Sequence, residues 1–245
     1  MKKVDAHFRG HKRSPFSSYL REVVYGAVDG IITTFAVVAG FSGAALSSDT
    51  TSQLSFAVVL LFGLANLFAD GVSMGLGNFL AVRSEQGLYR SLRIREKDSS
   101  IENGSREAEE TVQALIEKGF SEADAKTLTS IYRKNEPYWI DFILNNELKM
   151  SNPMDENPFS TGFATFVAFI TFGLIPLMPF IVLDTVNPET VFQISATGAF
   201  IALVILGIFK WKIVGTNVFK SILEVVIIGG LAATVAFFVG TLFAL

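Results

Sequence analysis

Residues 54–82 read LSFAVVLLFGLANLFADGVSMGLGNFLAV, and residues 23–46 read VVYGAVDGIITTFAVVAGFSGAAL. Each stretch exceeds the roughly 20 apolar residues that an α-helix needs to cross a bilayer. Each also contains one aspartate, Asp70 in the first and Asp29 in the second. A carboxylate at the centre of the hydrocarbon costs at least ~3 kcal/mol, so it normally faces a bundle interior and marks a path for ions or protons. The pattern favours a transporter over the alternative, in which each aspartate only bonds a neighbouring helix.

Three further apolar stretches, at about 160–183, 191–209 and 222–244, bring the predicted membrane spans to five. Half of the 245 residues are hydrophobic, which is too apolar a composition for an ordinary soluble domain. We therefore expect an all-α membrane protein with five transmembrane helices and a small helical cytosolic insert between the second and third.

The charged residues are unevenly distributed, with 26 of 43 lying between Arg83 and Glu156. The chain is accordingly expected to have four parts. They are a basic cytosolic N-terminal segment (1–22), transmembrane helices 1–2 (23–82), an acidic helical insert (83–158) and transmembrane helices 3–5 (159–245).

Lysine and arginine set the expected orientation in the membrane. They precede the first span, follow the second and separate the fourth from the fifth, whereas the loops 47–53 and 184–190 have none. Basic loops stay in the cytosol. The N-terminus and the insert are therefore predicted to be cytosolic, and the C-terminus external.

The insert is predicted to form short helices. Ser105 can cap a helix over 106–118, Gly119 suits the position after its end, and Ser121 can cap the next helix.

The insert also contains a group of acidic residues. Glu107 and Glu110 are spaced i, i+3 and share a helix face, with Glu96 near the end of the preceding helix. Clustered carboxylates suit cations such as Mn²⁺ and Fe²⁺, although a solvated acidic face has the same pattern.

Several functions are excluded or disfavoured. Cysteine is absent, so the chain has no disulfide and no thiolate metal site. We find no P-loop, no Gly-rich dinucleotide turn, no HExxH motif and no nucleophile–His–acid pattern, so we expect no enzyme and no cofactor. A net charge of −3 gives no reason to expect nucleic-acid binding.

Three stretches resemble the vacuolar iron transporter family: REVVYGAVDGIITTFAVVAGFSGA (21–44), SMGLGNFLAVRSE (73–85) and YWIDFILNNEL (138–148), which closes the acidic insert. The resemblance extends from about residue 21 to the C-terminus. It implies five membrane helices, a dimer, and export of Fe²⁺, and often Mn²⁺, from the cytosol in exchange for protons.

The resemblance also implies ligands. Asp29 and Met74 match family residues at a translocation site between two subunits. Four residues of the insert match glutamates that collect metal in the cytosol: Glu96, Glu107, Glu110 and Glu147. Four positions depart from the family pattern, which has Glu, Glu, Met and Met there: Asn66, Ser99, Ile143 and Leu144. We therefore expect a divergent member whose insert binds metal weakly.

Asp70 lies four residues after Asn66, which is about 6 Å along the same helix face. We hypothesise that Asp70 supplies the missing second-span acid and that Asn66 contributes its side-chain carbonyl. A buried Asp there is uncharged when the site is empty and charged when it holds metal, because burial disfavours the charged form and a cation favours it. Exchanging a proton for a metal ion in this way is the physical basis of antiport.

Two other functions remain open. A non-transporting membrane scaffold or metal sensor with the same fold is favoured by Asn66. A transporter for another substrate is the other alternative.

For a transporter of this family, the divalent metal is a substrate, and the partners are protons, the lipid bilayer and a second copy of the chain. The glycine pairs Gly26/Gly30 and Gly71/Gly75 support this homodimer, because small residues let helices approach closely. We expect a bacterial cell membrane, with a vacuolar membrane as the alternative.

Overall fold

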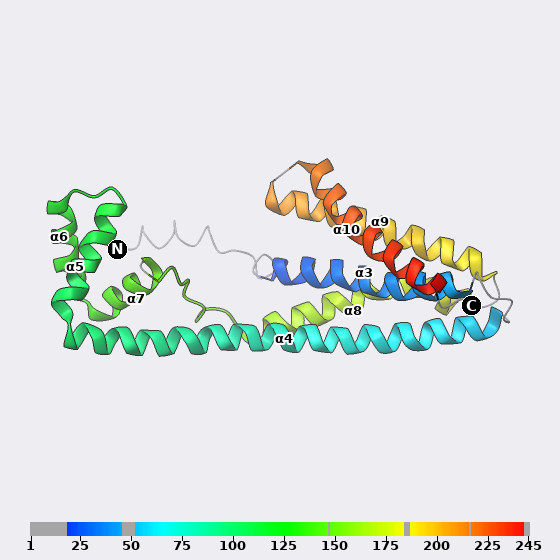
Figure 1. Ribbon diagram of the computed structural model, residues 1–245, viewed down its shortest axis with the longest axis horizontal. Helices are drawn as coiled ribbons and strands as arrows, with labels where there is room; N and C mark the ends of the chain where they lie inside the picture. The colour runs from blue at the N-terminus through cyan, green and yellow to red at the C-terminus, as the bar shows by residue number, and fades with distance from the viewer. Residues whose placement is uncertain (1–18, 46–51, 147, 184–186, 216, 243–245) are drawn as a thin grey trace, which may run out of the picture. The chain divides into compact units, whose positions relative to one another are not determined.

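The computed structural model describes residues 19–45, 52–146, 148–183, 187–215 and 217–242. These described residues are mostly α-helical and contain no strand (Figure 1). The helices are α3 (Leu20–Ala45), α4 (Ser52–Glu102), α5 (Gly104–Glu117), α6 (Glu122–Tyr132), α7 (Glu136–Asn146), α8 (Pro158–Val182), α9 (Pro188–Val214) and α10 (Val218–Leu242).

Five of these helices are long and apolar enough to cross a membrane: α3, α4, α8, α9 and α10. This confirms the predicted number of spans and identifies an integral membrane protein. Helix α4 has 51 residues and is about 77 Å long, far more than the ~30 Å of hydrocarbon in a bilayer. Its spanning part is the apolar first half, because charged residues recur from Arg83 onward.

The chain divides into two compact units. One consists of α3, α8, α9, α10 and α4 as far as Phe79, and the other consists of Leu80–Pro158. The first is called the membrane unit below, and the second the helical unit.

In the membrane unit, glycines bring helix backbones into contact. A Cβ placed on Gly26 would lie 2.7 Å from the carbonyl oxygen of Thr165, and one on Gly30 would meet the backbone of Phe169. A Cβ on Gly75 would lie 3.0 Å from the carbonyl oxygen of Gly162. Since Thr165, Phe169 and Gly162 are all in α8, these glycines serve packing within one chain. They no longer support a dimer, contrary to our expectation from the sequence.

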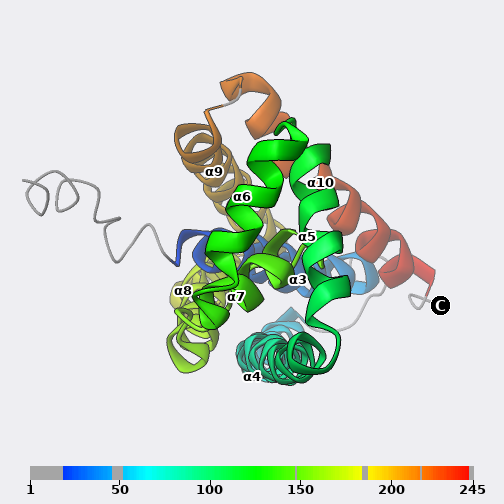
Figure 2. The ribbon, with the colours of Figure 1, turned by 90° about the vertical axis from the view of Figure 1, so that its left-hand side faces the viewer.

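In the helical unit, α5 packs against α6 (Figure 2). Ser121 caps α6, as predicted, by accepting a hydrogen bond from the backbone N–H of Asp124 (3.2 Å). Gly119 follows α5 with a φ of +94°, a conformation that glycine adopts without strain. The predicted cap at Ser105 is wrong. Asn103 holds that position, because its carbonyl oxygen accepts from the backbone N–H groups of residues 106 and 107.

Candidate functional site

Helix α4 carries a row of four polar or sulfur-containing side chains, Asn66, Asp70, Met74 and Asn78, which we call the α4 polar row. A spacing of four residues places each about 6 Å beyond the last on one side of the helix. All four are half-buried. The Nδ2 of Asn66 donates a hydrogen bond to Oδ2 of Asp70 (2.8 Å), so the first two members are joined as a pair.

Asp29 of α3 belongs to the same region. It is half-buried, and its carboxylate is near enough to that of Asp70 for the two charges to repel each other. The hydroxyl of Thr33 donates its proton to the backbone oxygen of Asp29 (2.8 Å), and so does not donate to the Asp29 carboxylate. The structure therefore places Asp29 of α3 within electrostatic range of the Asn66–Asp70 pair of α4.

Met74 lies one turn beyond Asp70 in the α4 polar row. Its side chain packs against a cluster of buried apolar residues that includes Leu67 and Phe169. The thioether thus has apolar neighbours on one side, while its place in the row puts it next to Asp70.

The α4 polar row borders the outer surface of the membrane unit. On one side of it lie the buried residues Leu67, Gly71 and Gly75. On the other side lies a stripe of small exposed residues, called the α4 small stripe: Ala65, Ala69, Ser73 and Gly77. The acids are therefore only partly enclosed by a single chain.

Asn78 ends the α4 polar row. Its Nδ2 donates to Oγ1 of Thr165 in α8 (2.8 Å), and this hydroxyl donates in turn to the carbonyl oxygen of Thr161 (3.0 Å). Our sequence reasoning missed Asn78. The signal was available, because the interval of four that links residues 66, 70 and 74 continues to 78.

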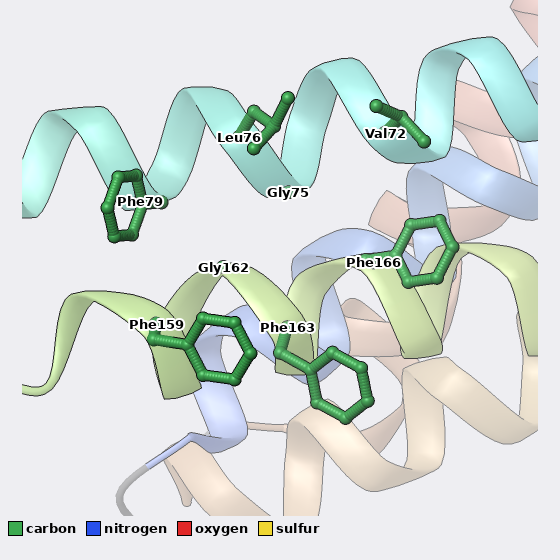
Figure 3. Close-up of a pocket in the computed structure, with 8 residues that line it drawn as sticks. All are labelled: Val72, Gly75, Leu76, Phe79, Phe159, Gly162, Phe163 and Phe166. Carbon is green, nitrogen blue, oxygen red and sulfur yellow. The ribbon is translucent and has the colours of Figure 1, made fainter.

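A groove between α4 and α8 is lined by Val72, Leu76, Phe79, Phe159, Phe163 and Phe166, with Gly75 and Gly162 at the closest approach of the helices (Figure 3). Aliphatic and aromatic side chains offer no oxygen or sulfur ligand. The groove is therefore no candidate for a cation site.

In the helical unit, the predicted acids lie near one another. Burial raises the pKa of Glu96 above its ordinary value, and the charge of Glu107 raises it further. Glu107 is 4% exposed and accepts a hydrogen bond from the hydroxyl of Ser99 (2.6 Å). Glu110 is exposed. Ser99, expected only as a lost ligand, thus engages one of the remaining glutamates.

Arg106 is a second partner that the sequence did not suggest. Its guanidinium lies 3.5 Å from Oε1 of Glu107 and 3.4 Å from Oε1 of Glu110. The guanidinium therefore pairs with both carboxylates and would compete with a cation for them. Glu147, the fourth predicted ligand of the insert, lies outside the described residues. Within the described part of the chain, no three His, Asp or Glu side chains are grouped so that they could hold a metal ion.

We expect the double variant Glu107→Ala/Glu110→Ala to bind nearly as much Mn²⁺ as its parent, because Ser99 and Arg106 already engage these glutamates. The measurement is electron paramagnetic resonance of Mn²⁺ with the full chain in detergent. Asp29→Asn/Asp70→Asn serves as the parent, so that the membrane acids do not contribute. Tight binding of several Mn²⁺ ions that the double substitution removes would contradict this expectation.

The amino-acid sequence is similar to that of known membrane transporters. A model described as the VIT family matches residues 20–241, which include Asp29 and the α4 polar row. A vacuolar iron transporter of Toxoplasma gondii is 36% identical over 234 residues, covering 92% of this chain and 74% of that protein. Vacuolar iron transporter 1 of Eucalyptus grandis is 31% identical (93% and 88% covered), and that of Arabidopsis thaliana is 30% identical (96% and 89%). These relatives are named as transporters, in agreement with the prediction that the chain is not an enzyme.

Proposed function

Because this chain belongs to the VIT family, we propose that it is a membrane transporter that moves Fe²⁺, Mn²⁺ or both out of the cytosol in exchange for protons. The observation that carries the proposal is that Asp29 and Asp70, on two spanning helices, lie within electrostatic range of each other. Two carboxylates in the hydrocarbon region of a membrane are costly, and such residues mark ion and proton paths.

The acid pair explains how protons and metal exclude each other. Two neighbouring carboxylates in a desolvated site repel each other, and either a bound proton or a bound cation relieves that repulsion. A divalent cation favours the charged form of both carboxylates and releases the proton. Protonation from the opposite side of the membrane then expels the cation.

The donor set suits borderline divalent metals. Asp29 and Asp70 supply carboxylate oxygens, and Asn66 supplies its amide oxygen, since its Nδ2 is engaged by Asp70. Met74 would add a soft sulfur ligand. Oxygen ligands suit Mn²⁺ and a thioether favours softer ions, so the set accepts both Fe²⁺ and Mn²⁺.

Uptake into proteoliposomes tests this function. Purified protein is reconstituted, a pH gradient is imposed, and entry of Fe²⁺, Mn²⁺, Co²⁺ and Zn²⁺ is measured together with proton movement. We expect uptake of Fe²⁺ or Mn²⁺ that the gradient accelerates and that Asp29→Asn abolishes. Binding of metal without flux would instead favour a membrane scaffold or sensor, the alternative that Asn66 supports.

The orientation and location follow from charge and are part of the proposal. Alternation of basic and non-basic loops favours a cytosolic N-terminus, a cytosolic helical unit and an external C-terminus. The basic N-terminal segment lies almost wholly outside the described residues. We propose a bacterial cell membrane, with a vacuolar membrane as the alternative.

We also propose that two copies form a homodimer through the α4 small stripe. Small residues let helices pack closely in a membrane, and this stripe is exposed beside acids that a single chain leaves half-covered. A second copy would shield those acids from lipid.

Crosslinking tests the dimer, because the native chain has no cysteine. We expect Ser73→Cys to form disulfide-linked dimers in membranes under mild oxidation, since Ser73 lies in the stripe. Leu231→Cys, which is 62% exposed on α10, is the control and should remain monomeric. Ala27 is fully buried, so a cysteine there would report nothing. Equal crosslinking at Ser73 and Leu231 would count against this interface.

A further inference from the structure

We propose that Asn78 is a further cation-contacting residue. Its amide oxygen, one turn beyond Met74, would bind a cation transiently as the cation moves along α4 toward Asp29 and Asp70. This inference rests on the proposed transport function and extends the site to a position that neither our sequence analysis nor the comparisons assign. The α4 polar row provides the spacing, and the bond to Thr165 provides the orientation.

The hydroxyl of Thr165 decides which way the Asn78 amide points. This hydroxyl uses its only proton to bond the carbonyl oxygen of Thr161, so toward Asn78 it can only accept. The amide must then turn its Nδ2 to Thr165 and leave Oδ1 for another partner. Among the described residues, Oδ1 of Asn78 has no hydrogen-bond donor.

The same arrangement occurs at the other end of the row. There the carboxylate of Asp70 takes the Nδ2 of Asn66 and leaves the amide oxygen of Asn66 available. In both Asn66 and Asn78, the amide nitrogen is engaged as a hydrogen-bond donor and the amide oxygen is left available. Because different partners orient the two amides in the same way, we infer that the α4 polar row presents oxygen acceptors to a cation.

An amide side chain suits a transient cation-binding position in a transporter. Its oxygen replaces a water molecule of the hydrated cation, and its lack of charge keeps the cation from being trapped. About 12 Å separates residues 70 and 78 along α4, with Met74 midway, so the cation need not cross an apolar gap.

A simpler role is possible for Asn78, namely to hold α4 against α8, and the test separates the two. We expect Asn78→Leu to raise KM for Mn²⁺ roughly tenfold in proteoliposomes, with the maximal rate changed less than about twofold. A tenfold change corresponds to about 1.4 kcal/mol, a reasonable value for one lost ligand. Asn78→Asp keeps an oxygen and should hold KM at or below that of the wild type.

Thr165 supplies the positioning test. Thr165→Val removes the acceptor that orients the amide and should raise KM, whereas Thr165→Ser retains the hydroxyl and should restore it. Thr234→Val is the matched control, because its hydroxyl bonds a carbonyl oxygen of its own helix α10 (2.7 Å) far from the row in sequence. The Kd for Mn²⁺ of the full chain in detergent should change in parallel with KM.

The outcomes are distinguishable. An Asn78→Leu protein with normal KM and normal Mn²⁺ affinity would overturn the role of Asn78, and so would a lower Tm with unchanged KM, which is the result of a purely structural contact. Absence of flux in the wild type would overturn the proposed transport function instead.

Discussion

Replacing Asp70 by Asn is expected to abolish proton-coupled metal transport while leaving the protein folded and inserted. The substitution keeps the shape of the side chain, and the new amide oxygen can still accept the bond from Asn66. It removes the group that releases a proton when a cation arrives. We expect the gradient-driven rate of Mn²⁺ or Fe²⁺ entry to fall at least about tenfold, equivalent to ~1.4 kcal/mol or more.

The rescue variant makes this prediction specific. Asn66→Glu, introduced together with Asp70→Asn, returns a carboxylate to α4 one turn away and should partly restore both metal flux and proton movement. A pH-sensitive dye inside the vesicles measures the proton, and the metal is measured in parallel. Unchanged flux and coupling in Asp70→Asn alone would leave Asp70 a structural residue.

Replacing Gly30 by Ala is expected to have the largest effect on stability. The added Cβ would meet the carbonyl oxygen of Phe169 and would lie 3.1 Å from its carbonyl carbon and Cα. These are backbone atoms and cannot rotate aside, so α3 and α8 must separate. Overpacking of this kind costs about 1–3 kcal/mol or more. We expect Gly30→Ala to lower the Tm of the detergent-purified protein by several degrees or to prevent its accumulation.

A matched control lies on α10. A Cβ on Gly230 would have nothing within 4 Å, so Gly230→Ala should be neutral or slightly stabilising, since alanine favours a helix. The two variants make the same chemical change in spanning helices. Equal Tm values for both would mean that α3 and α8 do not pack through a close contact between Gly30 and Phe169.

The sequence predicted those features that depend on local pattern. Apolar length predicted the five spans. The interval of four predicted that Asn66 and Asp70 share a helix face, although not the hydrogen bond that joins them. The cap at Ser121 was also predictable, because it depends on residues three apart.

Features that depend on distant partners were not predictable. Small-residue spacing cannot tell whether Gly26 and Gly30 face a second chain or α8, because the partner residues Thr165 and Phe169 are remote in sequence. In the same way, the family resemblance implied a lost ligand at Ser99, but not that its hydroxyl bonds Glu107. Arg106 drew no notice, since its pairing with Glu107 and Glu110 is visible only in three dimensions.

The backbone contact between Gly30 and Phe169 also has a consequence for biogenesis. The two residues are about 140 positions apart, so at a synthesis rate of 5–20 residues per second the ribosome needs on the order of ten seconds to make the second after the first. During that interval the first span, with its aspartate, must enter the bilayer without the helix against which it finally docks. The nascent chain therefore passes through an intermediate in which the first span lacks its packing partner. We expect the yield of inserted protein to depend on insertion factors that bind polar transmembrane segments.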